Sequence, residues 1–253
     1  MQTENLQLND SQLKAFLLTD GIPPRVVSYF DELPAKLGAP VRSILDCGGG
    51  NGMYLDMILD RFPEAEGTLV DSAQFMLDSN KPHPRKRLWL ENLEDMSSLL
   101  DSGQKFDLIC FTDVLHHCVV PTYAGTRALQ TTILKNAAKL LAPNGHVVVG
   151  ERIIDSWITD EYSVRTVFAL TRSRFLARVI RLFGANTAGV GVCFASRNRL
   201  QKLFEDAGLS ILEETHADSS EDHSLKKRLR IFVQRLALGA KSLRHDLFLL
   251  KAR

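Results

Sequence analysis

Short apolar runs alternate with stretches of helical pattern along most of this chain, and the alternation restricts the folds that it can adopt. The runs have the length of buried strands and are mostly bounded by turn or charged residues. Strands that alternate with helices favour a parallel, doubly wound α/β sheet with right-handed crossovers. The predicted strands cover residues 42–47, 66–71, 87–91, 106–111 and 145–150, with later strands at 209–214 and 245–253, and the predicted helices cover 51–62, 72–79, 94–100 and 126–142.

The first predicted strand runs directly into DCGGGNG, residues 46–52, and a helical pattern follows. Glycine has no Cβ, so such a turn lets a ligand lie against the backbone while the helix N-terminus offers free N–H groups. We therefore expect a flat or anionic small molecule here. The spacing argues against a dinucleotide, because the G-x-G-x-x-G pattern counted from Gly48 places Met53 where the third glycine belongs.

The alternative pattern, acidic-x-G-x-G-x-G, fits Asp46, Gly48, Gly50 and Gly52 without a gap. In this motif the chain resembles the class I S-adenosylmethionine (SAM)-dependent methyltransferases. The resemblance implies a Rossmann-like sheet of seven strands in the order 3-2-1-4-5-7-6 with the last strand antiparallel. It also implies that the acidic residue holds the amino-acid end of SAM, with S-adenosyl-L-homocysteine as the product. The cofactor-binding residues that follow are Asp46, Gly48, Gly49, Gly50, Gly52, Asp71, Ser72, Asn92, Leu93 and Thr112.

Two later residues extend the resemblance. Asp71 ends TLVD, nineteen residues after the last glycine of the motif, where the family has a carboxylate that accepts hydrogen bonds from both ribose hydroxyls. A cap for the following helix is the alternative role of this aspartate. Asn92 stands where many relatives have an aspartate that contacts adenine, and Leu93 is expected to pack on the ring. The substitution leaves the adenine contact open.

The stretch FDLICFTDVLHHC places Thr112, Asp113, His116 and His117 after the fourth predicted strand, at the sheet edge where open α/β folds bind ligands. It resembles small-molecule O-methyltransferases, whose catalytic histidine occupies the His116 position. A histidine suits the removal of a hydroxyl or amine proton, because its pKa lies near ambient pH. We predict His116 as the general base, with His117 and Asp113 beside it.

Two alternatives apply to the same residues. The LHH sequence also occurs in quinone and sterol C-methyltransferase relatives, and a structural histidine that caps the next helix is a further explanation. Asp113, His116 and His117 have the i, i+3, i+4 spacing of one helix face, which resembles the metal site of ubiquinone-pathway O-methyltransferases. No further carboxylate is adjacent, so we expect no metal.

Three segments are expected to surround the acceptor. Residues 1–40 predict an N-terminal helical lid or support, with a helix at 24–37, ahead of a methyltransferase domain over 41–253. Residues 153–195 predict a helical substrate cap, whose helix over 160–183 carries an apolar stripe that includes Phe168 and Phe175. The predicted substrate-binding residues are Tyr29, Glu151 and Tyr162.

A basic segment over 224–241 has apolar residues on one helical side and predicts an outer helix between the last two strands. Contact with an anionic membrane or a protein partner is the other interpretation. It leads to a second hypothesis, a SAM-fold protein that binds a ligand or partner without turnover.

Composition and motifs narrow the classes of function that this chain can have. The 253 residues are 45% apolar and carry a formal net charge of +1, so the chain can bury a core and has no overall charge that attracts nucleic acid. TDVLHH also differs from the Asn/Asp-Pro-Pro-aromatic motif common in base-amino methyltransferases. Four dispersed cysteines, no signal-peptide pattern and no spanning run predict a cytoplasmic protein without a membrane span. We expect a monomer or homodimer that methylates an oxygen, in preference to nitrogen or carbon, of a small, partly apolar molecule.

Overall fold

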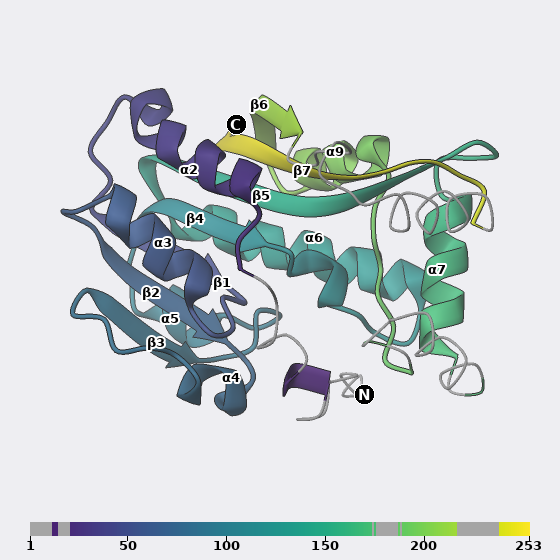
Figure 1. Cartoon of the computed structure of the whole chain (residues 1–253), viewed down its shortest axis with the longest axis horizontal. Coiled ribbons are helices and arrows are strands. Elements are labelled where there is room, and N and C mark those ends of the chain that lie inside the picture. The colour runs from purple at the N-terminus through teal and green to yellow at the C-terminus, as the bar shows by residue number, and fades with distance from the viewer. Residues whose placement is uncertain (1–11, 15–20, 174, 176–186, 188, 217–237) are drawn as a thin grey trace.

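The computed structural model, described over residues 12–14, 21–173, 175, 187, 189–216 and 238–253, contains one seven-stranded sheet (Figure 1). Its order is β3-β2-β1-β4-β5-β7-β6, and β7 pairs antiparallel with both neighbours. The predicted order and the antiparallel last strand are confirmed. The strands are β1 (Ser43–Cys47), β2 (Glu66–Asp71), β3 (Lys86–Leu90), β4 (Phe106–Thr112), β5 (Leu141–Ser156), β6 (Leu209–His216) and β7 (Ala240–Ala252).

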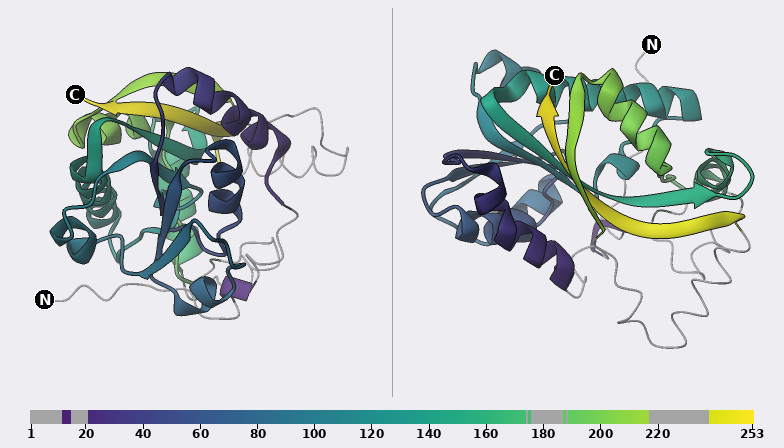
Figure 2. Two further views of the ribbon diagram at one scale, coloured as in Figure 1. Left: turned by 90° about the vertical axis from the view of Figure 1, so that its left-hand side faces the viewer. Right: turned by 90° about the horizontal axis from the view of Figure 1, so that it is seen from above.

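Helices cover both faces of the sheet and make a three-layer molecule (Figure 2). One face packs against α2, α3 and α4, and the other packs against α5, α6 and α9. The strands of the sheet centre are therefore buried on both sides, as their continuous apolar sequence predicts. The helices are α2 (Pro24–Leu37), α3 (Met53–Arg61), α4 (Gln74–Asp78), α5 (Ser97–Asp101), α6 (Tyr123–Leu140), α7 (Tyr162–Arg172) and α9 (Arg197–Asp206), with a 3₁₀ turn, η1 (Leu115–His117), after β4.

Helix α2 has the bounds that the sequence predicts. Pro24 stands in the first turn, where a missing N–H costs nothing, and Gly38 ends the helix in a left-handed conformation with φ of 62°. The helix buries Val26, Phe30 and Leu33 against α3 and the sheet. It is thus an integral part of the core on this face.

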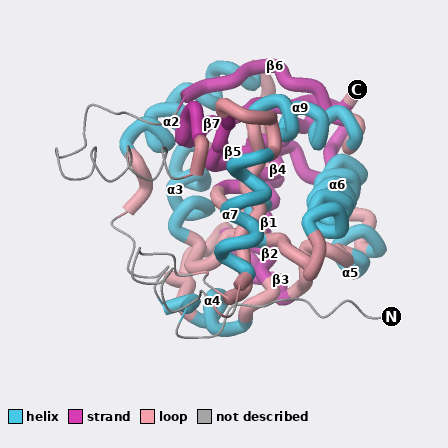
Figure 3. Tube along the Cα trace, turned by 90° about the vertical axis from the view of Figure 1, so that its right-hand side faces the viewer, coloured by secondary structure: helices cyan, strands magenta, loops and turns pink. Residues whose placement is uncertain are grey.

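Strands β5 and β7 are longer than predicted, because they pair with each other beyond the sheet centre up to Ser156 and Ala240. This two-stranded extension carries α7, which stands in front of the sheet when the molecule is seen from the right-hand side of Figure 1 (Figure 3). The helix predicted over 160–183 is shorter in the described part, because it ends at Arg172 and Ser173 leaves the helical conformation. Phe168 is buried as predicted, whereas Phe175 lies beyond that end and is exposed.

The basic segment predicted as an outer helix over 224–241 lies largely outside the described residues. Its last part is described, and there the prediction is wrong. Leu238 and Gly239 form a turn, and Ala240 and Lys241 already belong to β7, where they continue the pairing with β5.

Candidate active site

A cavity of about 480 Å³ opens at the carboxyl edge of the sheet, within the size range of small-molecule sites. The segments that follow β1, β2, β3 and β4 line it, with one residue of β5 and three residues from the N-terminal part of the described chain. Parallel strands bring these distant segments together because their carboxyl ends meet at one edge. Nine of the ten predicted cofactor-binding residues line this cavity, and Gly52 does not.

The glycine loop has the backbone that only glycine adopts without strain. Gly48, Gly50 and Gly52 have φ values of 69°, 55° and 77°. A Cβ on Gly48 would lie 2.2 Å from Val114 Cγ2, and one on Gly52 would lie 2.0 Å from Asn80 Oδ1. Glycine is therefore needed here for its backbone conformation and also because the protein's own side chains pack tightly against the loop. The sequence had led us to expect space for a ligand.

Two carboxylates flank this loop. Asp71 Oδ2 accepts a hydrogen bond from the Gly50 N–H at 3.0 Å, and Oδ1 accepts one from the Ala73 N–H at 2.8 Å. Asp71 therefore caps the following turn and fixes the loop at the same time, and its carboxylate has further acceptor capacity. Asp46 is buried, and its Oδ2 has no hydrogen-bond partner among the described residues. Burial, with the neighbouring Asp71 carboxylate, raises the pKa of Asp46 to about 7.

The remaining predicted cofactor residues complete one wall. Asn92 Oδ1 accepts a hydrogen bond from the Glu94 N–H at 3.2 Å, which folds the segment after β3 into a turn. Leu93 is buried beside Gly48. Thr112 ends β4, and its Oγ1 is buried without a hydrogen-bond partner in the described chain.

These features meet the requirements of SAM. A buried carboxylate oxygen without a partner suits the ammonium group of the methionine part, and Asp71 has acceptor capacity for a diol. Leu93 and the unpaired Thr112 hydroxyl lie in the same lining. The residues present therefore fit the cofactor that the sequence motif implies.

At the other end of the cavity, η1 presents His116, whose ring is buried. Its Nδ1 lies 2.7 Å from Glu151 Oε2, and the other carboxylate oxygen of Glu151 accepts a hydrogen bond from the Leu115 N–H at 2.7 Å. A carboxylate beside Nδ1 fixes the tautomer in which Nδ1 carries the proton and Nε2 carries the lone pair. Glu151 lies behind His116 and does not line the cavity.

A polar frame from α6 holds this turn. Gln130 Nε2 donates to the backbone carbonyls of Leu115 at 2.7 Å and of Cys193 at 3.2 Å. The Cys193 N–H in turn donates to the His116 carbonyl at 2.9 Å. The segment before α9 is thereby attached to the η1 turn.

Phe194 follows in the same segment and stacks on the His116 ring, with 4.7 Å between centroids. The buried guanidinium of Arg127 donates to the Phe194 carbonyl and fixes the position of this residue. Sequence analysis singled out neither Phe194 nor Gln130. Phe194 stacks on His116, and Gln130 joins the backbone carbonyls that precede these two residues in the chain, so only the fold brings them together.

His117 and Asp113 also line the cavity, and their charges differ. Burial, with the adjacent His116, holds the pKa of His117 well below its usual range, so His117 is neutral. Burial raises the pKa of Asp113, but His245, His116 and Arg152 outweigh this effect and hold the pKa well below its usual range. Asp113 is thus a carboxylate at neutral pH. These residues do not form the helix face that the metal alternative assumed, because Asp113 precedes η1 with a φ of 54°.

The two predicted tyrosine contacts lie elsewhere. Tyr29 is buried in α2, edge-on to Phe30, with the Lys36 ammonium 5.1 Å from its ring centroid. Tyr162 begins α7, is 45% exposed, and packs near Gly239 at the turn before β7. In the described structure neither side chain lines the cavity, so their contact with substrate stays a prediction.

Comparison with known proteins agrees with this geometry. A family model described as a methyltransferase domain matches residues 22–214, well over half of the chain. The chain therefore belongs to the methyltransferase domain family, and its fold is that of the class I SAM-dependent methyltransferases. The resemblance to this family that the glycine motif indicated is confirmed. No match is found among curated proteins.

Solved structures with the same fold include both O- and N-methyltransferases. An O-methyltransferase family protein from Burkholderia thailandensis has a TM-score of 0.56 at 18% identity, over 90% of this chain and 55% of that one. The N-methyltransferase NodS from Bradyrhizobium japonicum WM9, solved with S-adenosyl-L-homocysteine, has a TM-score of 0.58 at 15% identity, over 98% and 99%. CalO1, a methyltransferase in calicheamicin biosynthesis, has 0.53 at 16% identity, over 90% and 54%. The chain thus spans about half the length of the first and third.

Among the helices that the structure describes, none has the length and apolar character that crossing a bilayer requires.

Proposed function

We propose that this enzyme transfers the methyl group of SAM to a hydroxyl oxygen of a small, partly apolar molecule. The observation that carries the proposal is that one cavity joins the glycine loop, with Asp46 and Asp71, to the buried His116–Glu151 pair. A cofactor at the first end and an acceptor hydroxyl at the second end would then share one cavity.

The cofactor end would hold SAM by its polar groups. The Asp46 carboxylate would accept from the ammonium group, and Asp71 would accept from the two ribose hydroxyls. Asn92 and Leu93 line the part of the cavity that remains for adenine. When bound there, SAM supplies a methyl group made electrophilic by the adjacent sulfonium.

The acceptor end would prepare the nucleophile. His116 Nε2 would take the hydroxyl proton as the oxygen attacks, while Nδ1 keeps its proton in the hydrogen bond to Glu151. The Glu151 carboxylate stabilises the imidazolium that forms, and stacking on Phe194 holds the ring plane. Alignment of the oxygen with the methyl carbon would supply much of the rate, and the base would supply the remainder.

The predicted roof agrees with the cavity lining in part. Leu13, Gly21 and Pro23 line the cavity from the N-terminal side, which supports a lid role for residues 1–40. From the predicted cap over 153–195, Cys193 and Phe194 support the His116 turn. We infer that both segments enclose the acceptor.

A two-part experiment tests the proposal. Calorimetric titration with SAM, S-adenosylhomocysteine and NAD should show binding of the first two compounds alone. Mass-shift screening of small phenols, acids and quinols with SAM should then show a gain of one methyl group on a hydroxyl-bearing acceptor. Methylation confined to amines would reassign the acceptor atom, and SAM binding with no transfer to any compound would favour a non-catalytic binding protein.

A further inference from the structure

A second histidine–carboxylate pair, His245 and Asp113, borders the same cavity and has no part in the proposed proton transfer. His245 belongs to β7, opposite Arg152 of β5 in the strand register, and its side chain is 8% exposed. Its Nε2 lies 3.4 Å from Asp113 Oδ1, and Arg152 Nε lies 3.7 Å from the same oxygen. Asp113 and Arg152 line the cavity, whereas His245 stands behind them.

The pair is poorly satisfied within the protein. Asp113 Oδ1 and His245 Nε2 are both buried without a well-formed hydrogen bond among the described residues. Asp113 also has a left-handed backbone, which is uncommon outside glycine, and its N–H donates to the Gly150 carbonyl at 2.8 Å. Buried unpaired polar atoms and backbone strain in one residue are typical of a binding site.

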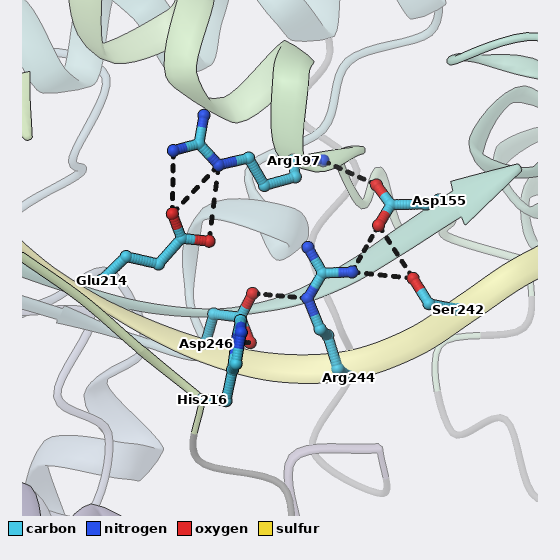
Figure 4. Close-up of polar contacts among 7 residues, drawn as sticks. All are labelled: Asp155, Arg197, Glu214, His216, Ser242, Arg244 and Asp246. Carbon is cyan, nitrogen blue, oxygen red and sulfur yellow. Dashed lines mark hydrogen bonds and ion pairs between the residues drawn. The ribbon is translucent and has the colours of Figure 1, made fainter.

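The opposite face of β7 explains how His245 is held in place. Successive side chains of a strand point to opposite faces, so Arg244 and Asp246 face away from His245. There Arg244 binds Asp155 and Asp246, and His216 Nδ1 lies 2.8 Å from Asp246 Oδ1 (Figure 4). The Arg244–Asp155 ion pair fixes β7 against β5 and so keeps the His245 ring directed at Asp113, whereas His216 is an exposed contact at the edge of this network.

The charges around Asp113 decide what it can bind. Arg152 and His245 already stand beside its carboxylate, so a second cation would be repelled by Arg152. An anion would be repelled by the Asp113 carboxylate. A neutral hydroxyl group is repelled by neither charge. It can donate a hydrogen bond to Asp113 Oδ1, which has no well-formed hydrogen bond in the described chain.

We propose that Asp113, backed by His245 and Arg152, is an acceptor subsite that binds a hydroxyl group next to the oxygen that is methylated. The substrate class is therefore a vicinal dihydroxy compound in which one oxygen reacts near His116 and its neighbour donates to Asp113. His245 acts as a positioning residue. The inference rests on the proposed function, because it assigns the second contact of the same acceptor.

The test uses the full chain saturated with S-adenosylhomocysteine and compares binding of 1,2-dihydroxybenzene with binding of phenol. A hydrogen bond to a carboxylate should make the dihydroxy compound bind about tenfold or more tightly. Asp113→Asn should reduce this ratio to within about twofold, and His245→Asn should reduce it by about threefold. In turnover with SAM, both variants should raise KM for the dihydroxy compound more than they lower kcat.

His216→Asn is the matched control, because His216 pairs with Asp246 from the neighbouring β6 strand and lies outside the cavity. It should leave the ratio unchanged, which separates the subsite from general loosening of β7. Equal affinities for the two compounds in the wild type, no binding of the dihydroxy compound, or a ratio that survives Asp113→Asn would overturn the inference. Methylation of phenol without any such preference would leave the proposed function intact.

Discussion

The two ends of the cavity each contain a largely buried aspartate, and their environments shift the pKa of the two carboxyl groups in opposite directions. Asp46, at the glycine loop, has burial and the Asp71 carboxylate around it, and its pKa rises to about 7. Asp113, after β4, is also largely buried, but His245, His116 and Arg152 bring its pKa well below the usual range. The same side chain is thus a weak acid at one end and a permanent carboxylate at the other.

The difference in pKa follows from the charges that surround each aspartate. The cofactor end has no cation beside the Asp46 carboxylate that outweighs its burial, so a ligand ammonium would complete the site. The acceptor end contains its own cations, which stand beside the Asp113 carboxylate before any ligand arrives. A cationic cofactor and a neutral acceptor are the ligands that this contrast favours.

The largest effect is expected at the acceptor end, from His116→Ala. Loss of the base should lower turnover by about 10²- to 10⁴-fold and leave the affinity for SAM within about twofold, because the glycine loop is untouched. Initial-rate kinetics with calorimetry of the same variant measure both quantities. Wild-type turnover would remove His116 from the mechanism.

Glu151→Gln separates proton transfer from positioning at the same end. The amide keeps the shape of Glu151 but removes the charge that stabilises the His116 imidazolium. Without that charge, both kcat and the pH dependence of the rate should change. If Glu151 only held the His116 ring in position, the pH–rate profile and its midpoint would stay the same. Thermal unfolding of both variants identifies any loss of folding.

The next effect belongs to the cofactor end, where Asp46→Asn should stabilise the ligand-free protein and weaken SAM. The folded-state pKa of about 7 lies above the ordinary value of 3.8, so the folded state binds the proton more tightly. The stability that this carboxyl contributes is full below about pH 4 and is lost as pH rises through 7. At pH 8 the variant should gain up to about 4 kcal/mol in the free energy of unfolding, and at pH 4 it should gain almost nothing.

The same linkage applies to the ligand. An ammonium group binds the ionised form of Asp46, so the affinity of the wild type for SAM should fall by about tenfold per pH unit below 7. Asp46→Asn should show weak binding with a flat profile. Denaturant titration and calorimetry from pH 4 to 8 test both statements, and an equal gain in stability at all pH values would contradict the buried-carboxylate explanation.

Sequence analysis predicted the lining of the cavity at the glycine loop more completely than the contacts around His116. Asp46 and the glycines follow one strand within seven residues, and Asp71 ends the next strand, so local spacing contains most of that site. The sheet order was predictable as well, because the strands have clear apolar patterns and the family resemblance supplied the topology. Gly52 was predicted with the other glycines, but it does not line the cavity and packs on the outer side of the loop, against Asn80.

The acceptor end depends on contacts that spacing does not reveal. Glu151 binds His116 across 35 positions, and its predicted contact with substrate stays a prediction. Phe194 comes from a segment with a weak pattern. His245 lies on β7, whose paired length with β5 was underestimated. Such partners are determined by tertiary packing, so a sequence without an alignment gives no signal for them.

A smaller effect is expected from Asp71→Ala, which tests the second carboxylate of the cofactor end. Removal of the acceptor for ribose hydroxyls should weaken SAM by about 1–3 kcal/mol. Asp78→Ala is the control, because Asp78 is exposed on the adjacent α4 and binds only Gln74 in the described chain. Unchanged affinity in the first variant would remove Asp71 from the ribose contact.

The smallest effect separates backbone conformation from packing in the glycine loop. Gly48 and Gly103 share a φ of 69°, but nothing lies within 4 Å of a Cβ built on Gly103, whereas one on Gly48 would meet Val114 Cγ2. Substitution by alanine should cost both positions the same left-handed strain, about 1–2 kcal/mol. Gly48→Ala should lose about 1 kcal/mol more, because Val114 has to move. Denaturant unfolding of the two variants measures that difference, and calorimetry with SAM should show weaker binding for Gly48→Ala alone. Equal unfolding free energies would mean that the loop tolerates a side chain, and the glycine at 48 would then serve conformation only.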